Sequence, residues 1–150
     1  MENGIRRTAP WLAAILCLTL ALPALAAKED RAFFDAETAY REGAFRKALS
    51  KLEDFIETYP ESRYVREAVF YAGESAIAID KFSIARRHYE DYLDRFPDGP
   101  VALRAEHGRA LALAGEGRDV DAVAALLAVA PRLERSRDQA DCYRRAAAIQ

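Results

Sequence analysis

A pattern of apolar and small residues occurs twice in this chain, and the second copy lies 37 residues after the first. The matched pairs are Phe45 and Phe82, Ala48 and Ala85, Leu52 and Tyr89, Phe55 and Tyr92, Ile56 and Leu93, Tyr59 and Phe96, and Pro60 and Pro97. Another step of 37 residues reaches a weaker third copy at Gly117, Ala122, Leu126 and Val129. A fixed period in this range is typical of structural units stacked along one axis.

Within each copy, the apolar residues recur at spacings of three and four, which predicts helices. Gly43 ends the first helix, because glycine readily takes the left-handed conformation of a helix end. Pro60 ends the second, because the residue before a proline avoids the helical region. Asp119 is expected to cap a later helix. The predicted helices span residues 29–42, 45–58, 63–79, 82–95, 101–114, 120–130 and 136–149.

The period divides the chain into three helix–turn–helix units and a final helix. The units cover about residues 29–62, 63–99 and 100–134, and residues 135–150 form a cap. Ala36, Gly73 and Ala110 stand at the same repeat position, where a small residue lets two helices approach closely. The cap is rich in charge, as a terminal repeat should be, because its outer face meets water. The fold class predicted is therefore all-α, an α-solenoid.

The first 26 residues have a different composition. Arg6 and Arg7 precede an apolar run from Trp11 to Leu22, and small residues follow it up to Ala26. A charged head, an apolar middle and a small-residue end predict a secretory signal peptide, removed after Ala26. The repeat domain would then be residues 27–150, in the periplasm or associated with the outer membrane.

Several alternatives remain open for this region and for the cysteines. Cleavage could follow Ala27, or the segment could stay as an N-terminal anchor. Cys17 could carry a lipid, although Leu16 before it is larger than a lipidation site favours. Cys142 is interpreted as a small buried apolar residue, and an intermolecular disulfide is the alternative.

Composition and charge exclude several functions. The formal net charge is −2, so the chain has no basic field to hold nucleic acid. His88 and His107 stand in different units, and no Cys or His cluster has the spacing of a metal site. We therefore expect no catalysis and no cofactor, and no membrane span once the signal is removed.

The repeated residues resemble the tetratricopeptide repeat, a helix–turn–helix unit. The positions that carry the resemblance are Ala36, Gly73 and Ala110 in the first helices, Gly43, Asp80 and Gly117 at the turns, the pairs Phe45 with Ala48 and Phe82 with Ala85, and the closing Pro60 and Pro97. The segment from Phe55 to Ala68 is similar to the variant of bacterial envelope proteins. Those include outer-membrane assembly lipoproteins of the BamD kind and the TolA-binding cell-division coordinator.

The resemblance implies a concave groove lined by the first helix of each pair, which binds a peptide. The residues it implies are Phe33, Glu37, Tyr40 and Arg41 in the first unit, Phe70, Glu74 and Ile77 in the second, and Arg104, His107 and Leu111 in the third. Aromatic side chains would anchor the peptide and charges would orient it. The alternative is that Phe33 and Phe70 pack between helices.

The sequence thus predicts a periplasmic, non-catalytic adaptor that binds a segment of an envelope protein, in a process such as outer-membrane assembly or cell division. The alternative is a structural subunit that self-associates or completes a larger repeat assembly. The apolar residues Ala146, Ala147 and Ile149 of the incomplete fourth unit are the reason for this alternative.

Overall fold

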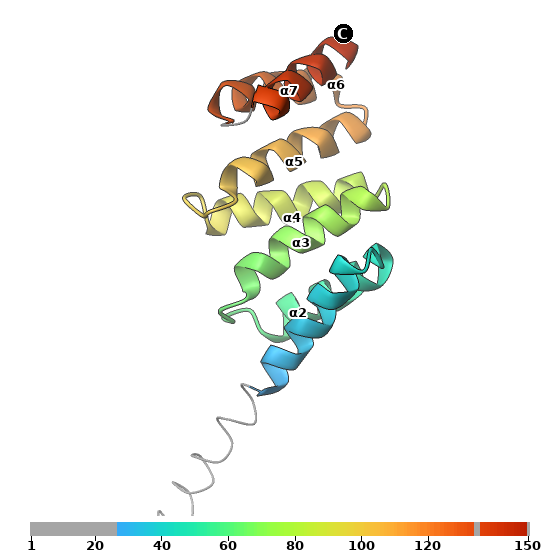
Figure 1. Ribbon diagram of the computed structural model, residues 1–150, viewed down its shortest axis with the longest axis vertical. Helices are drawn as coiled ribbons and strands as arrows, with labels where there is room; N and C mark the ends of the chain where they lie inside the picture. Colours follow the sequence, from blue (N-terminus) through green and yellow to red (C-terminus); the bar gives the residue numbers. More distant parts are fainter. Residues whose placement is uncertain (1–26, 134–135, 150) are drawn as a thin grey trace, which may run out of the picture.

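The structure, a computed structural model, describes residues 27–133 and 136–149. Helices cross the long axis of the molecule one above another, so that the described chain forms a column (Figure 1). The elements are a first helix at residues 27–41, α2 (Phe45–Thr58), α3 (Val65–Ala78), α4 (Phe82–Arg95), α5 (Ala102–Gly115), α6 (Asp119–Val129), the short 3-10 helix η1 (Ala130–Arg132) and α7 (Ser136–Ile149).

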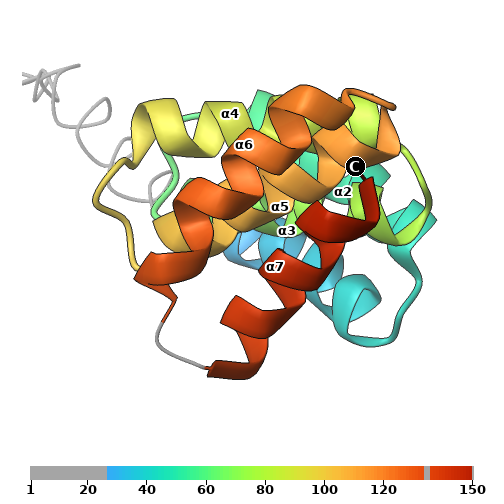
Figure 2. The same cartoon turned by 90° about the horizontal axis from the view of Figure 1, so that it is seen from above.

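Each helix packs against its neighbour in sequence, from α2 to α7. Viewed along the column, α4 and α6 lie on one side and α7 lies on the other (Figure 2). The second helices of the second and third units therefore lie on one side, and α7, which follows the third unit, lies on the opposite side. This arrangement confirms the predicted all-α solenoid.

The turn inside each pair uses a left-handed residue at the same repeat position. Gly43 has a φ of 74°, Asp80 a φ of 57° and Gly117 a φ of 73°. At each turn the chain leaves the first helix and reverses into the second, and a positive φ makes that reversal short. The predicted cap of α6 is wrong. Asp119 lies inside the first turn of α6, Arg118 stands at the N-cap position, and no side chain caps the helix.

Most of the core is one cluster whose aromatic rings come from the first two units and which alanines of α5 extend into the third. Its largest members are Phe33, Phe55, Phe70, Tyr89 and Tyr92, all of them buried. Neighbouring rings meet at tilted or edge-to-face angles; Phe70, for example, lies 5.9 Å from Tyr92 and 6.1 Å from Tyr89 between ring centroids. Large rings fill the spaces between helices with few side chains.

A second, smaller cluster joins α5, α6 and α7 and has no aromatic member. It consists of Ala110, Leu126, Ala130, Cys142 and Ala146. Cys142 is fully buried there, which confirms its interpretation as a small apolar core residue. Burial also keeps its sulfur away from other chains in the folded protein, which argues against the intermolecular disulfide.

The outer face of α6 is apolar, unlike the outer faces of α2 and α4. Val120 is 84% exposed, and Ala124, Leu127 and Ala128 on the same helix are exposed too. The corresponding residues are Arg46, Ser50, Glu53 and Asp54 in α2, and Ser83, Arg87, Glu90 and Asp91 in α4. The third unit has therefore replaced a polar outer surface with an apolar one.

The predicted signal peptide, residues 1–26 including Cys17, lies outside the described residues. Among the described helices, none combines the length and the apolar character needed to cross a bilayer.

Candidate functional site

A cleft of about 910 Å³ lies between the first helices of the second and third units. Its residues come from α3 and α5, from Tyr89 of α4, and from the turns that precede α5 and follow α6. They are Glu74, Ile77, Ala78, Tyr89, Pro100, Leu103, Arg104, His107, Gly108, Leu111, Arg132 and Leu133. Both apolar and charged side chains line this cleft, a combination that a peptide segment can use.

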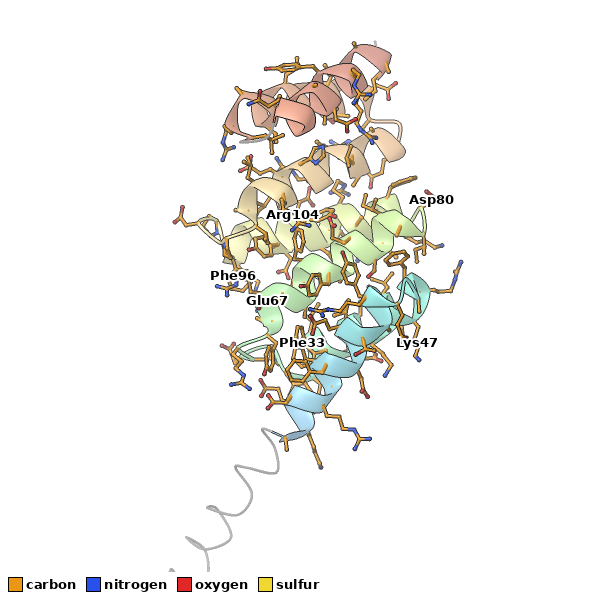
Figure 3. All side chains as sticks on the ribbon, in the orientation of Figure 1. Phe33, Lys47, Glu67, Asp80, Phe96 and Arg104 are labelled. Atoms are coloured by element: carbon orange, nitrogen blue, oxygen red, sulfur yellow. The ribbon has the colours of Figure 1, made fainter. Side chains whose placement is uncertain are left out.

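Five of the ten predicted groove residues line the cleft. They are Glu74, Ile77, Arg104, His107 and Leu111. The period brings them together because α3 and α5 are equivalent helices stacked in the same orientation. Figure 3 shows Arg104 at the N-terminal part of α5, on the side towards α3.

Phe33 and Phe70 are core residues, so their assignment to a binding surface is wrong. The Phe33 ring stacks on Tyr64 at 4.5 Å and meets Phe55 at 5.6 Å between centroids. Phe70 is buried against Tyr89 and Tyr92. Burying a phenyl ring between helices gains more free energy than leaving it on a solvated face. The alternative interpretation, packing between helices, is therefore correct.

The other three predicted residues of the first unit lie on helix 27–41 and do not line the cleft. Tyr40 stacks on Tyr71 at 4.7 Å between ring centroids. Burial, and then the nearby charge of Glu74, raise the pKa of the Tyr40 hydroxyl. Glu37 and Arg41 form an ion pair of 2.9 Å. Tyr40 therefore packs against α3 through Tyr71, outside the cleft.

Tyr89 lines the cleft, although the repeat pattern indicated only an apolar position equivalent to Leu52. Its ring fits between two glycines: a Cβ on Gly73 would stand 2.8 Å from the ring, and one on Gly108 only 2.3 Å. Its hydroxyl donates a hydrogen bond of 2.7 Å to Oε1 of Glu74. Burial, followed by the charge of Glu74, raises the pKa of Tyr89, so the hydroxyl stays protonated and remains a donor. Two glycines within helices were the signal in the sequence, since glycine there indicates close packing.

Arg132 and Leu133 form another part of the wall that sequence reasoning missed. They follow α6, in the turn that η1 makes at Pro131. The side-chain amide of Gln139 donates a hydrogen bond of 2.6 Å to the carbonyl oxygen of Leu133, which ties this turn to α7. Arg132 pairs with Glu106 of α5. The available signal was Pro131, which stands three residues before position 134, where the period of Pro60 and Pro97 would place the next proline.

Within the described parts of the chain, no group of three or more His, Cys, Asp or Glu side chains is placed to hold a metal ion. The polar side chains of the cleft are Arg104 and Arg132, which are ion-paired, Glu74, which accepts the hydrogen bond of Tyr89, and His107.

Residues 67–99 match a family model described as a tetratricopeptide repeat. The matched stretch contains nearly all of α3, its turn, and α4. No curated protein matches the chain at a significant level. The match and the stack of helix pairs together support a tetratricopeptide-repeat protein, and such repeats typically serve as protein-interaction scaffolds.

Proposed function

We propose that this chain is a periplasmic, non-catalytic adaptor that binds a segment of another envelope protein in the cleft between α3 and α5. The observation that carries the proposal is the cleft itself, which joins equivalent surfaces of two successive repeats. Ile77, Leu103 and Leu111 provide apolar surface for the bound segment, and the charge of Arg104 can fix the direction in which it lies. A helix or an extended segment can use both at once.

The compartment and the process belong to the proposal as well. The charged, apolar and small-residue succession of residues 1–26 supports export. The likeness of the segment from Phe55 to Ala68 to envelope repeat proteins supports a role in outer-membrane assembly or cell division. Fractionation of cells that express the full chain tests export: the protein should appear in the periplasmic fraction, shortened by the signal.

Site-specific photo-crosslinking tests the cleft. A photoreactive phenylalanine analogue replaces Leu103, which lines the cleft, or Arg87, which lies exposed on α4. Irradiation of living cells should give a discrete crosslinked band with the variant at Leu103 and none with the variant at Arg87. Mass spectrometry of the band then identifies the partner. A band of equal intensity with both variants, or only with the variant at Arg87, would move the contact away from the cleft.

The apolar outer face of α6 favours a second function, a structural subunit that self-associates. Ala146, one of the residues that suggested this from the sequence, is buried in the second cluster, so α6 offers the larger exposed surface. Sedimentation of the purified protein tests it. A dimer that the substitution Leu127→Glu converts to a monomer would support the structural subunit, and a monomer at every concentration would reject it.

A further inference from the structure

The charged residues of the cleft differ in sign from the chain as a whole. The formal net charge of the chain is −2. The titratable lining residues with an ordinary charge at neutral pH are two arginines, Arg104 and Arg132, and one glutamate, Glu74, and His107 lies among them. An excess of positive charge around a cleft attracts ligands of negative charge.

The ion pairs of this face also share one feature, which is the partner that is more exposed to solvent. In each pair the arginine is the more exposed partner and the carboxylate lies beneath it. The side-chain exposures are 62% for Arg104 and 29% for Glu74, 56% for Arg132 and 22% for Glu106, and 74% for Arg41 and 17% for Glu37. A ligand that approaches this face therefore meets guanidinium groups first.

The glutamate of the cleft is already engaged by its neighbours. Glu74 accepts the hydrogen bond of Tyr89 through Oε1 and lies 3.6 Å from Arg104 through Oε2. The Arg104 guanidinium lies 4.8 Å above the ring of Phe70, which holds the side chain in place. Arg104 has five N–H donors, so it can bind a second carboxylate while it keeps its contact with Glu74.

We infer that the cleft binds an acidic peptide segment. In this segment one apolar side chain is flanked by carboxylates. This inference rests on the proposed function and specifies the chemistry of its ligand. The apolar side chain lies against Ile77, Leu103 and Leu111, and the flanking carboxylates pair with Arg104 and Arg132. Arginine suits this role because its planar fork matches a carboxylate in two hydrogen bonds.

Fluorescence polarisation of labelled peptides tests the inference. Three peptides share a central leucine and differ only in the flanking residues, which are glutamate, glutamine or lysine. The purified protein should bind the glutamate peptide about tenfold more tightly than the glutamine peptide, and the lysine peptide most weakly. Raising the salt from about 50 mM to about 500 mM should weaken binding of the glutamate peptide most, because salt screens exposed charges.

Reversing the charge of single arginines tests where the peptide binds. Arg104→Glu and Arg132→Glu should each lower the affinity for the glutamate peptide about tenfold and raise the affinity for the lysine peptide. Arg87→Glu makes the same change of charge on the opposite face and should leave both affinities unchanged. Helical circular dichroism of all three variants should match that of the unmodified protein.

The outcomes separate this inference from the proposed function. Tighter binding of the lysine or glutamine peptide, or no binding of any peptide at millimolar concentration, overturns the acidic ligand, whatever the crosslinking at Leu103 shows. Equal effects of Arg87→Glu and Arg104→Glu overturn it too, because they indicate attraction to the whole surface. Displacement of the glutamate peptide by an oligonucleotide of equal charge would indicate a general polyanion site and would also reject it.

Discussion

The ring of Tyr89 lies in a slot that exists because α3 and α5 carry glycine where they meet it. The ring separates the two helices, and its hydroxyl reaches the cleft to hold Glu74. One side chain therefore sets both the spacing of two repeats and the position of a charged group in the candidate site. Changes at this residue or at its glycines should affect packing and the cleft together.

Gly108→Ala should destabilise the protein. The added Cβ would stand 2.3 Å from Cζ of Tyr89, and the buried ring has little room to move. Overpacking of this kind costs about 1 to 3 kcal/mol, while alanine in a helix recovers up to about 1 kcal/mol over glycine. We expect a net loss of roughly 1 kcal/mol in the free energy of unfolding, measured by urea denaturation.

A second variant tests whether contact with the Tyr89 ring causes this loss of stability. In a Tyr89→Leu background, Gly108→Ala should cost less, because leucine does not reach the added methyl group. An equal cost in both backgrounds would show that the ring is not what the methyl group meets.

Tyr89→Phe should reveal how much the Tyr89 hydroxyl contributes to the free energy of unfolding. At neutral pH the loss of a hydrogen bond to a carboxylate should cost about 1 to 2 kcal/mol. The pKa of Tyr89 is raised in the folded state, so its stabilisation is complete below the ordinary tyrosine pKa, about 10, and is lost as the pH rises beyond it. The free energy of unfolding should therefore fall more steeply above that pH in the unmodified protein than in Tyr89→Phe. Parallel pH profiles would contradict the assignment.

The turn inside each helix pair is the element that the repeat conserves most closely in geometry. Gly43 and Gly117 fit its left-handed position without strain, whereas Asp80 occupies it with a side chain. A left-handed conformation costs a residue with a Cβ about 1 kcal/mol or more, and aspartate somewhat less. The second unit, which the tetratricopeptide-repeat model matches, therefore contains a strained residue.

Asp80→Gly should stabilise the protein by about 0.5 kcal/mol, the relief of strain less the extra entropy of glycine in the unfolded chain. Thermal unfolding measures the effect. Asp98→Gly is the matched control, since Asp98 is exposed in the turn before α5 and has no positive φ. It should give no gain, and a similar gain from both substitutions would point to charge as the cause.

Across the whole molecule, stability should decrease from the first two units towards the C-terminal end. The first cluster contains large aromatic rings, whereas the second consists of alanines, a leucine and a cysteine. In stacked repeats each unit is stabilised by its neighbours, so the end with the smaller interface opens first. The wall of the cleft that Arg132 and Leu133 form belongs to this less stable end.

Thiol labelling without denaturant tests this gradient. Cys142 should react through a local opening whose free energy is lower than that of global unfolding, measured in a Cys17→Ser background. The control is Ser75→Cys, which places a thiol at a fully buried position of α3 in a chain without Cys17 and Cys142. That thiol should react only as the whole protein unfolds. Equal opening free energies at the two positions would show a single cooperative unit.

Local signals were sufficient to locate the helices. The predicted bounds of residues 45–58, 82–95 and 136–149 agree with α2, α4 and α7, and the others differ by one or two residues. Helical periodicity and helix-ending glycine and proline act over a few residues along the chain, so they can be recognised without knowledge of the fold. The period of 37 residues then implied the stack and brought Glu74, Arg104 and Leu111 to one face.

The orientation of individual side chains depended on contacts between units. Phe33 and Phe70 share a helix face with polar residues, yet they lie in the core because a neighbouring helix covers them. Tyr89 reaches the cleft, and Arg132 completes it, through distances between elements that are far apart in sequence. Helical periodicity identifies the face of a residue but not the distance to the next helix, and that distance determines whether a side chain is covered or open to a ligand.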